Sequence, residues 1–208
     1  MNDTPSSAAM PQTPAVDALG QTPSQTVGPY FAYGLVPSQY GYDLPSLWGS
    51  DLADPGASGE PITLMGRVFD GQGKTVFDAL IEILQADAQG RYLSTPEEVK
   101  AAGFRGFGRM GTGSREDHRF VFRTIKPGVS ADGHAPHIDV ILTLRGLLNA
   151  LHTRIYFAED AALHANDPVL AQVPAERRFT LIARKDAQGI HQFDLYLQGP
   201  QETVFFDV

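Results

Sequence analysis

Short runs of alternating apolar and polar residues, each ended by a turn, constrain the fold of this chain most strongly. In the first run Ile62, Leu64 and Val68 alternate with Thr63 and Arg67, as in a strand with one buried face. The Asp-Gly-Gln-Gly sequence that follows predicts a tight turn. Similar runs cover residues 79–86, 119–125, 138–144, 153–157, 193–197 and 203–207. Seven such runs predict an all-β fold, a β-sandwich of mostly antiparallel strands with long loops.

Helix signals are few. Thr95, Pro96 and Glu98 stand in the order of an N-cap, an N1 proline and an N3 glutamate, which is typical of a helix start. We therefore expect one short helix that ends at Ala102.

The periodic pattern also divides the chain. Residues 1–20 are rich in Pro, Ser, Thr and Ala without apolar periodicity, so we expect a flexible N-terminal tail. Residues 21–60 hold many Pro, Gly and aromatic residues but few alternating positions, and we expect an extended arm that packs on another surface. Residues 61–208 should form the sandwich, giving one domain over 21–208.

Composition excludes several classes of function. With 24 acidic and 16 basic residues among 208, the net charge is −8, which argues against a nucleic-acid partner. The chain has no cysteine, so it can form neither a disulfide nor a thiolate metal site. No apolar run approaches the ~18 residues of a membrane span, and no basic leader is present. We expect no membrane association and a cytoplasmic location.

The sharpest local cluster of chemical groups is His137-Ile138-Asp139 on a predicted strand. Residues two apart on a strand share a face, so one imidazole and one carboxylate could hold part of a metal site. Alternatively, the histidine bonds a neighbouring loop and the aspartate lies at a solvent edge. His191 is a plausible distal ligand by spacing. However, no Lys or Arg follows Lys185 to hold an oxoglutarate co-substrate, so that class of oxygenase is excluded.

Arg145 ends an apolar strand inside an otherwise uncharged stretch. Desolvating a guanidinium is costly without an anion. Either Arg145 forms an ion pair or reaches solvent, or it binds a carboxylate-bearing ligand.

Several segments resemble intradiol ring-cleavage dioxygenases. The similar segments are Thr22 to Tyr30 (TPSQTVGPY), Ile83 to Tyr92 (ILQADAQGRY, with Leu84 where a Trp is usual), Thr124 to Gly128, Thr153 to Phe157 and Thr203 to Asp207. The resemblance covers residues 21–208 and implies the β-sandwich of that family.

The resemblance also implies a ferric site of two Tyr and two His, of which this chain keeps only part. Tyr92 and His137 match two ligands, while Ser130 stands where the second Tyr is expected and Asp139 where the second His is expected. The incomplete set implies that this chain has no catalytic residue and binds no metal. The four positions would then be vestiges of a metal site. The Fe(III) cofactor would be held by a partner beta chain of the same fold.

In such a pair, the resemblance implies that Arg145, Thr26, Gly28 and Pro29 line the pocket for a small aromatic substrate, with Arg145 facing its carboxylate. Two other hypotheses stay open. The chain could be a stand-alone binding module for a carboxylate ligand, or an autonomous metalloenzyme that uses Tyr92, His137 and Asp139.

Overall fold

The computed structural model describes residues 25–28 and 31–207. The predicted flexible tail over 1–20 and the pocket residue Pro29 lie outside the described residues. The strands in the described part are β1 (Pro61–Phe69), β2 (Leu80–Gln85), β3 (Phe107–Gly111), β4 (Arg119–Ile125), β5 (His137–Thr143), β6 (Leu151–Phe157), β7 (Ile182–Lys185), β8 (His191–Gln192) and β9 (Leu195–Tyr196). The helices are α1 (Phe31–Leu35), α2 (Pro96–Ala102) and α3 (Ala161–His164), with 3-10 turns η1 (Pro37–Tyr40), η2 (Thr112–Ser114), η3 (Ala158–Asp160), η4 (Leu170–Gln172) and η5 (Ala175–Leu181).

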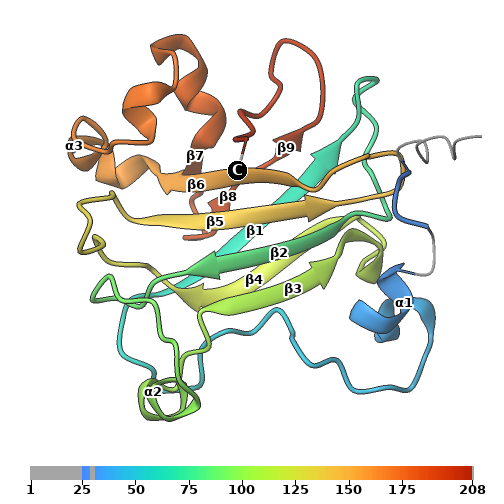
Figure 1. The fold of residues 1–208 in the computed structure, drawn as a ribbon, viewed down its shortest axis with the longest axis horizontal. Coiled ribbons are helices and arrows are strands. Elements are labelled where there is room, and N and C mark those ends of the chain that lie inside the picture. Colours follow the sequence, from blue (N-terminus) through green and yellow to red (C-terminus); the bar gives the residue numbers. More distant parts are fainter. Residues whose placement is uncertain (1–24, 29–30, 208) are drawn as a thin grey trace, which may run out of the picture.

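The strands form two layers that are joined at one side (Figure 1). The front layer has the order β3-β2-β5-β6 and is antiparallel throughout. The path continues through β7 and β8 to the rear pair β1-β4, and β9 also pairs with β1. The predicted sandwich of mostly antiparallel strands is confirmed, with parallel pairing between β6 and β7 and where β1 meets β8 and β9.

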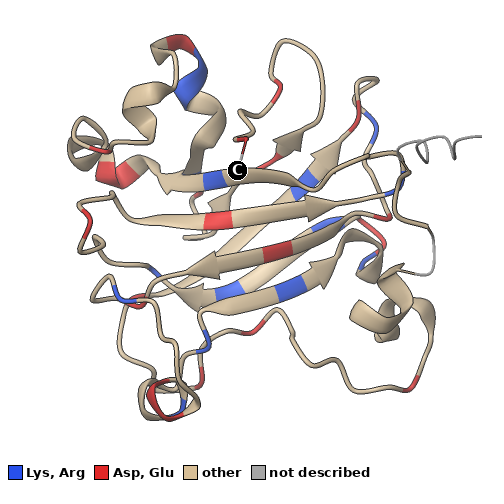
Figure 2. Cartoon of the chain, in the orientation of Figure 1, with Lys and Arg blue, Asp and Glu red and all other residues tan. Residues whose placement is uncertain are grey.

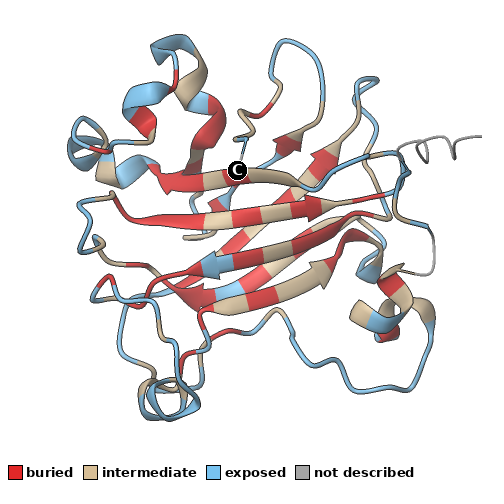
Figure 3. Ribbon diagram, viewed as in Figure 1, coloured by how far each residue is buried: buried red, intermediate tan, exposed pale blue. Residues whose placement is uncertain are grey.

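The core fills the space between these layers, because alternate residues of each strand point inward (Figure 3). Gly66 interrupts the apolar alternation of β1 for a steric reason: a Cβ there would lie 1.7 Å from the carbonyl oxygen of Phe193. Full burial of one aliphatic or phenylalanine side chain contributes about 1.5–3 kcal/mol. The inward set includes Leu64, Val68, Ile81, Ile83, Phe120, Phe122, Ile138, Val140 and Leu142.

The predicted helix is confirmed as α2. The Thr95 hydroxyl accepts the Glu98 N–H at 3.2 Å, and the Glu98 carboxylate accepts the Thr95 N–H at 3.1 Å. Pro96 occupies the first turn, and Gly103 ends the helix with a φ of 60°. Glu98 is therefore the reciprocal half of a capping box.

Other elements differ from the sequence prediction. Of the strand predicted over 193–197, only Leu195–Tyr196 is a strand, β9, and the two-residue β8 comes just before it. Residues 203–207 form only an isolated bridge between Phe206 and His152. The strands β3 and β7 and the helices α1 and α3 were not predicted. The β3 sequence FGRMG has two glycines and no clear alternation. The four-residue β7 pairs with β6, which lies earlier in the chain, and across a short turn with the two-residue β8. No helix in the described part of the chain is both long and apolar enough to cross a membrane.

Candidate functional site

Three of the four residues in the predicted ligand positions meet on the outer face of the front layer. His137 and Asp139 share one face of β5, as predicted, with 3.7 Å between the His137 Nε2 and the Asp139 Oδ2. The Tyr92 hydroxyl donates to the same Oδ2 at 3.2 Å and lies 3.4 Å from Nε2 of His137. The His137 Nδ1 is 2.7 Å from the Ala135 carbonyl oxygen, which fixes the orientation of the ring.

A tight turn after β2 places Tyr92. The Asp87 Oδ1 accepts the N–H groups of Gln89 and Arg91, both at 2.9 Å. Gly90 has a φ of +78°, and a Cβ there would lie 1.8 Å from the Val129 carbonyl oxygen. Glycine is therefore needed at this position on both grounds, and the close approach sets the 128–130 loop beside Tyr92.

Ser130, the fourth position, lines the same cavity of about 330 Å³ as Tyr92 and His137. Its hydroxyl is used locally, since it accepts the N–H of His134 at 3.2 Å. Ser130 thus closes the 130–134 loop rather than joining the Tyr92–His137–Asp139 cluster.

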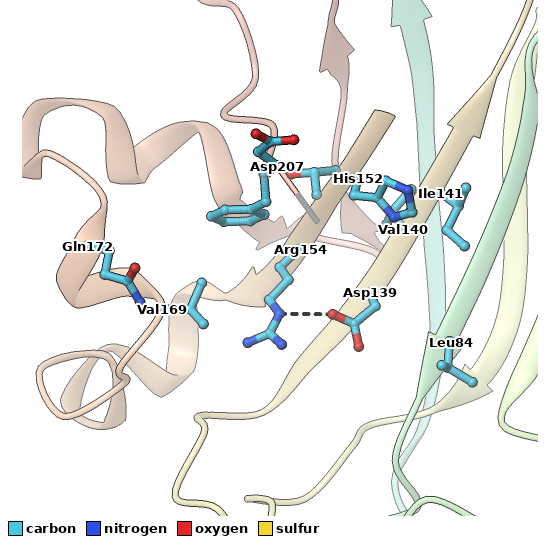
Figure 4. A pocket seen from close by; sticks show the side chains of 11 residues that line it. Leu84, Asp139, Val140, Ile141, His152, Arg154, Val169, Gln172 and Asp207 are labelled. Carbon is cyan, nitrogen blue, oxygen red and sulfur yellow. Dashed lines mark hydrogen bonds and ion pairs between the residues drawn. The ribbon is translucent and has the colours of Figure 1, made fainter. Parts of the chain in front are cut away.

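Arg154 is a site residue that the sequence analysis missed. It lies opposite Asp139 in the β5–β6 register, and its Nε donates to the Asp139 Oδ1 at 2.9 Å. Figure 4 shows this pair on the wall of a neighbouring cavity of about 460 Å³. The alternating apolar pattern placed this residue on a strand, but the pairing register depends on the 144–150 connection, which no short motif encodes.

The charge of this cluster is balanced by Arg154. Burial alone raises the pKa of Asp139, but the contacts with His137 and Arg154 outweigh it and bring the pKa below its usual value. Burial, then the charge of Asp139, raises the pKa of Tyr92 to about 12, so its phenol is protonated at neutral pH. In Figure 2 a blue patch on β6 lies beside a red patch on β5, and a red patch on β2 lies beside a blue patch on β3. Arg109 of β3 pairs with Glu82 of β2 at 2.5 Å.

These donors do not fit ferric iron. The family set implied by the resemblance has two tyrosines and two histidines, whereas this cluster has one of each and a carboxylate already paired with a guanidinium. A trivalent cation would also lie beside the positive charge of Arg154. Among the described residues, no group of three or more His, Asp or Glu side chains is arranged to hold a metal ion.

The structure separates His191 from this cluster. The side chain of His191 is fully buried, and its Nε2 lies 2.8 Å from the Glu159 Oε1. Burial raises the pKa of Glu159, but the contacts with His191 and Lys126 outweigh it and lower the pKa to about 2. His191 therefore belongs to a structural ion-pair network.

The predicted substrate-binding residues lie at the opposite end of β5. The Thr26 hydroxyl accepts the N–H of Gly146 at 2.7 Å, so the N-terminal segment that carries Thr26 and Gly28 contacts the Arg145 loop. For Arg145 the structure shows the first of the two alternatives, an ion pair and access to solvent. Its side chain is 47% exposed and pairs with Asp78, because β5 ends at Thr143 and Arg145 lies in the turn that follows.

A small cavity of about 200 Å³ lies beside this arginine. The Cζ of Arg145 is 5.9 Å from the centre of the Phe77 ring. The remaining lining residues are Phe31, Tyr33, Tyr40 and Asp78. The site thus combines one cation with aromatic walls, which suits an aromatic acid.

Comparison with known proteins agrees with this fold. The model of a family described as "Dioxygenase" matches residues 28–199. The chain is 55% identical to the protocatechuate 3,4-dioxygenase alpha chain of Burkholderia cepacia over 91% of this chain and 98% of that protein. It is 34% identical to the protocatechuate 3,4-dioxygenase beta chain of the same organism, over 70% of this chain and 67% of that one.

Among solved structures, the dioxygenase domain of a dioxygenase carbohydrate-binding protein fusion from Streptomyces sp. SirexAA-E aligns with a TM-score of 0.58 and 28% identity. That alignment covers 76% of this chain and 92% of the other. The sandwich, the partial ligand set and these similarities agree: the chain belongs to the dioxygenase family that includes the alpha and beta chains of protocatechuate 3,4-dioxygenase.

Proposed function

We propose that this chain is the alpha subunit of a protocatechuate 3,4-dioxygenase and forms part of the substrate pocket beside the iron of a beta chain. The hetero-oligomer would cleave 3,4-dihydroxybenzoate between its two hydroxylated carbons. Both atoms of O2 enter the product, 3-carboxy-cis,cis-muconate, so the reaction needs no other oxidant.

One observation carries the contribution of this chain: Arg145, Thr26 and Gly28 come from distant parts of the sequence and lie at one end of the sandwich. The half-exposed guanidinium of Arg145 can accept a further anion from outside this chain. A carboxylate is the group that a guanidinium fork binds best, and the substrate carries one on its ring.

The iron belongs in the partner under this proposal. The pairing of Asp139 with Arg154 and the local hydrogen bond of Ser130 support a chain that holds no ferric ion. The ferric ion of the beta chain supplies the activation of the catechol for reaction with O2.

The role of this chain is then binding and orientation. Arg145 would attract the substrate carboxylate and fix the ring in the pocket, while the N-terminal segment with Thr26, Gly28 and Pro29 would close one side. Holding the ring in one orientation favours attack on the correct bond. Positive charge outside the iron site also raises the local concentration of an anionic substrate.

The test is the variant Arg145→Ala in the hetero-oligomer formed with a beta chain. Loss of one charge-assisted contact should lower kcat/KM for 3,4-dihydroxybenzoate by about 10- to 100-fold, while iron per beta chain stays constant. As a control, Arg123→Ala removes an exposed arginine that pairs with Asp51 on the rear pair of strands and should leave kcat/KM unchanged.

Iron analysis of this chain alone and with a beta chain tests the location of the metal. We expect ring cleavage and iron only when the beta chain is present. Unchanged kinetics in Arg145→Ala would remove Arg145 from the pocket, and stoichiometric ferric iron in the isolated chain would contradict the assignment of the metal.

A further inference from the structure

Asp78 stands opposite Arg145 at the end of the β2–β5 pair. Leu80 is paired with Thr143 in this antiparallel register, and continuing the register by two residues brings Asp78 opposite Arg145. The Asp78 side chain is 15% exposed, whereas that of Arg145 is 47% exposed. Asp78 is thus the more buried residue of the ion pair, and Arg145 is the more exposed one.

The contact also determines which side of the guanidinium faces outward. Asp78 binds Nε, the inner nitrogen of the group, and the two terminal amino groups extend beyond it. The Phe77 ring next to Asp78 lies 5.9 Å from Cζ of the same guanidinium. One loop before β2 therefore restrains Arg145 both by charge and by ring contact.

We propose that Asp78 is a positioning residue that holds Arg145 ready for the substrate carboxylate and so favours carboxylated over uncharged catechols. The inference rests on the proposed function. Asp78 touches Arg145 rather than the substrate, so it acts through the arginine.

Two effects of Asp78 would change affinity in opposite directions. An unrestrained arginine must be ordered when the substrate binds, which weakens binding by about two- to tenfold. The negative charge of Asp78, in contrast, competes with the substrate for the guanidinium. Since Asp78 binds the inner nitrogen and not the two terminal amino groups, we expect the ordering effect to dominate.

The experiment uses the hetero-oligomer with a beta chain and compares two substrates, 3,4-dihydroxybenzoate and catechol. Asp78→Ala should raise the KM for 3,4-dihydroxybenzoate by about two- to tenfold and change the KM for catechol less, so the ratio of the two KM values rises. Asp78→Asn keeps an oxygen that can accept from Nε, and should raise the ratio less than Asp78→Ala. Asp51→Ala removes an exposed aspartate–arginine pair elsewhere, with 3.0 Å between its charged atoms, and serves as the matched control.

A double-mutant cycle separates this inference from the proposed function. When Arg145 is already alanine, Asp78→Ala should add no further change. If Arg145→Ala changes neither kcat/KM nor KM for 3,4-dihydroxybenzoate, the proposed role of Arg145 in the pocket fails, and the role of Asp78 fails with it. Suppose instead that Arg145→Ala raises the KM for 3,4-dihydroxybenzoate. The role of Asp78 alone is then overturned if Asp78→Ala leaves this KM unchanged or lowers it, or if it raises the KM values for both substrates equally. If the Asp78→Ala chain does not assemble with the beta chain, Asp78→Asn provides the test. An unchanged ratio of the KM values for 3,4-dihydroxybenzoate and catechol in Asp78→Asn then overturns the role of Asp78.

Discussion

Asp167 offers a quantitative test of how the loop before β5 is held in place. Its side chain is fully buried and joins the loop before β5 to the segment after α3. Replacing it with asparagine changes one acceptor into a donor with almost no change of shape. The four hydrogen bonds at stake come from Tyr156 Oη at 3.1 Å, Val169 N at 2.9 Å and Leu170 N at 2.8 Å to Oδ1, and from Ala135 N at 2.9 Å to Oδ2.

The magnitude follows from these bonds. In Asp167→Asn the amide oxygen can serve the three donors at Oδ1, and the new NH2 group then faces the Ala135 N–H. One buried donor loses a charged acceptor, which costs about 1.5–3 kcal/mol. Each kcal/mol shifts the Tm of a domain of this size by about 2–4 °C, so we expect a decrease of roughly 3–12 °C. Asp167→Ala leaves all four donors without this acceptor and should cost more.

The loss of stability in Asp167→Asn should become smaller as the pH falls. Burial raises the pKa of Asp167, but its hydrogen bonds from Leu170, Ala135, Tyr156 and Val169 outweigh it, so the pKa in the folded chain lies below its usual value. The stabilisation is then complete above the unfolded pKa of about 3.9 and is lost as the pH falls through the lower folded-state pKa.

Thermal unfolding of the hetero-oligomer, followed by circular dichroism at pH 7 and at decreasing pH, measures both effects. The Tm difference between wild type and Asp167→Asn should narrow on acidification. Asp54→Asn is the control, because the Asp54 side chain is 65% exposed and its contact with Arg105 is long, at 3.8 Å. This variant should have the Tm of the wild type. An unchanged Tm at pH 7, or a difference that grows in acid, would refute the reasoning.

Two further predictions concern the backbone. Gly90→Ala should lower the Tm of the hetero-oligomer, because the alanine Cβ would collide with the Val129 carbonyl at 1.8 Å in a left-handed conformation; a wild-type melting curve would mean that the turn can shift freely. Thr95→Ala removes the side-chain half of the α2 capping box and should cost about 1 kcal/mol in the same measurement, and no loss would show that this helix end does not limit stability.

Much of the sandwich could be predicted because its signals are local. The runs that became β1, β2, β4, β5 and β6 each bury alternate residues in one core, so the period of two is visible in the sequence. The α2 start was equally clear, since Thr95 and Glu98 are close enough to form the capping box alone. By contrast, the residues of β3 and β7 carry little pattern of their own, and these strands form by pairing with β2 and with β6 and β8.

In the candidate site, too, features with a local sequence signal could be predicted, and features that depend on strand pairing could not. The shared face of His137 and Asp139 follows from strand geometry, and was predicted. The partners Asp78 for Arg145 and Arg154 for Asp139 depend on strand register, which is set by loops of variable length. For Arg145 the sequence left an ion pair, access to solvent or a carboxylate ligand open, because the apolar stretch around it does not show where the strand ends and the turn begins.

The Asp139–Arg154 pair has a consequence for how this chain matures. A guanidinium attached to β6 supplies the positive charge that the carboxylate needs, so the polar centre is complete once the polypeptide has folded. Under the proposed function, metal delivery, metal scarcity and chelators should therefore leave this chain intact. Building an iron site here by mutation would require removal of this cation, in addition to a tyrosine at position 130 and a histidine at position 139.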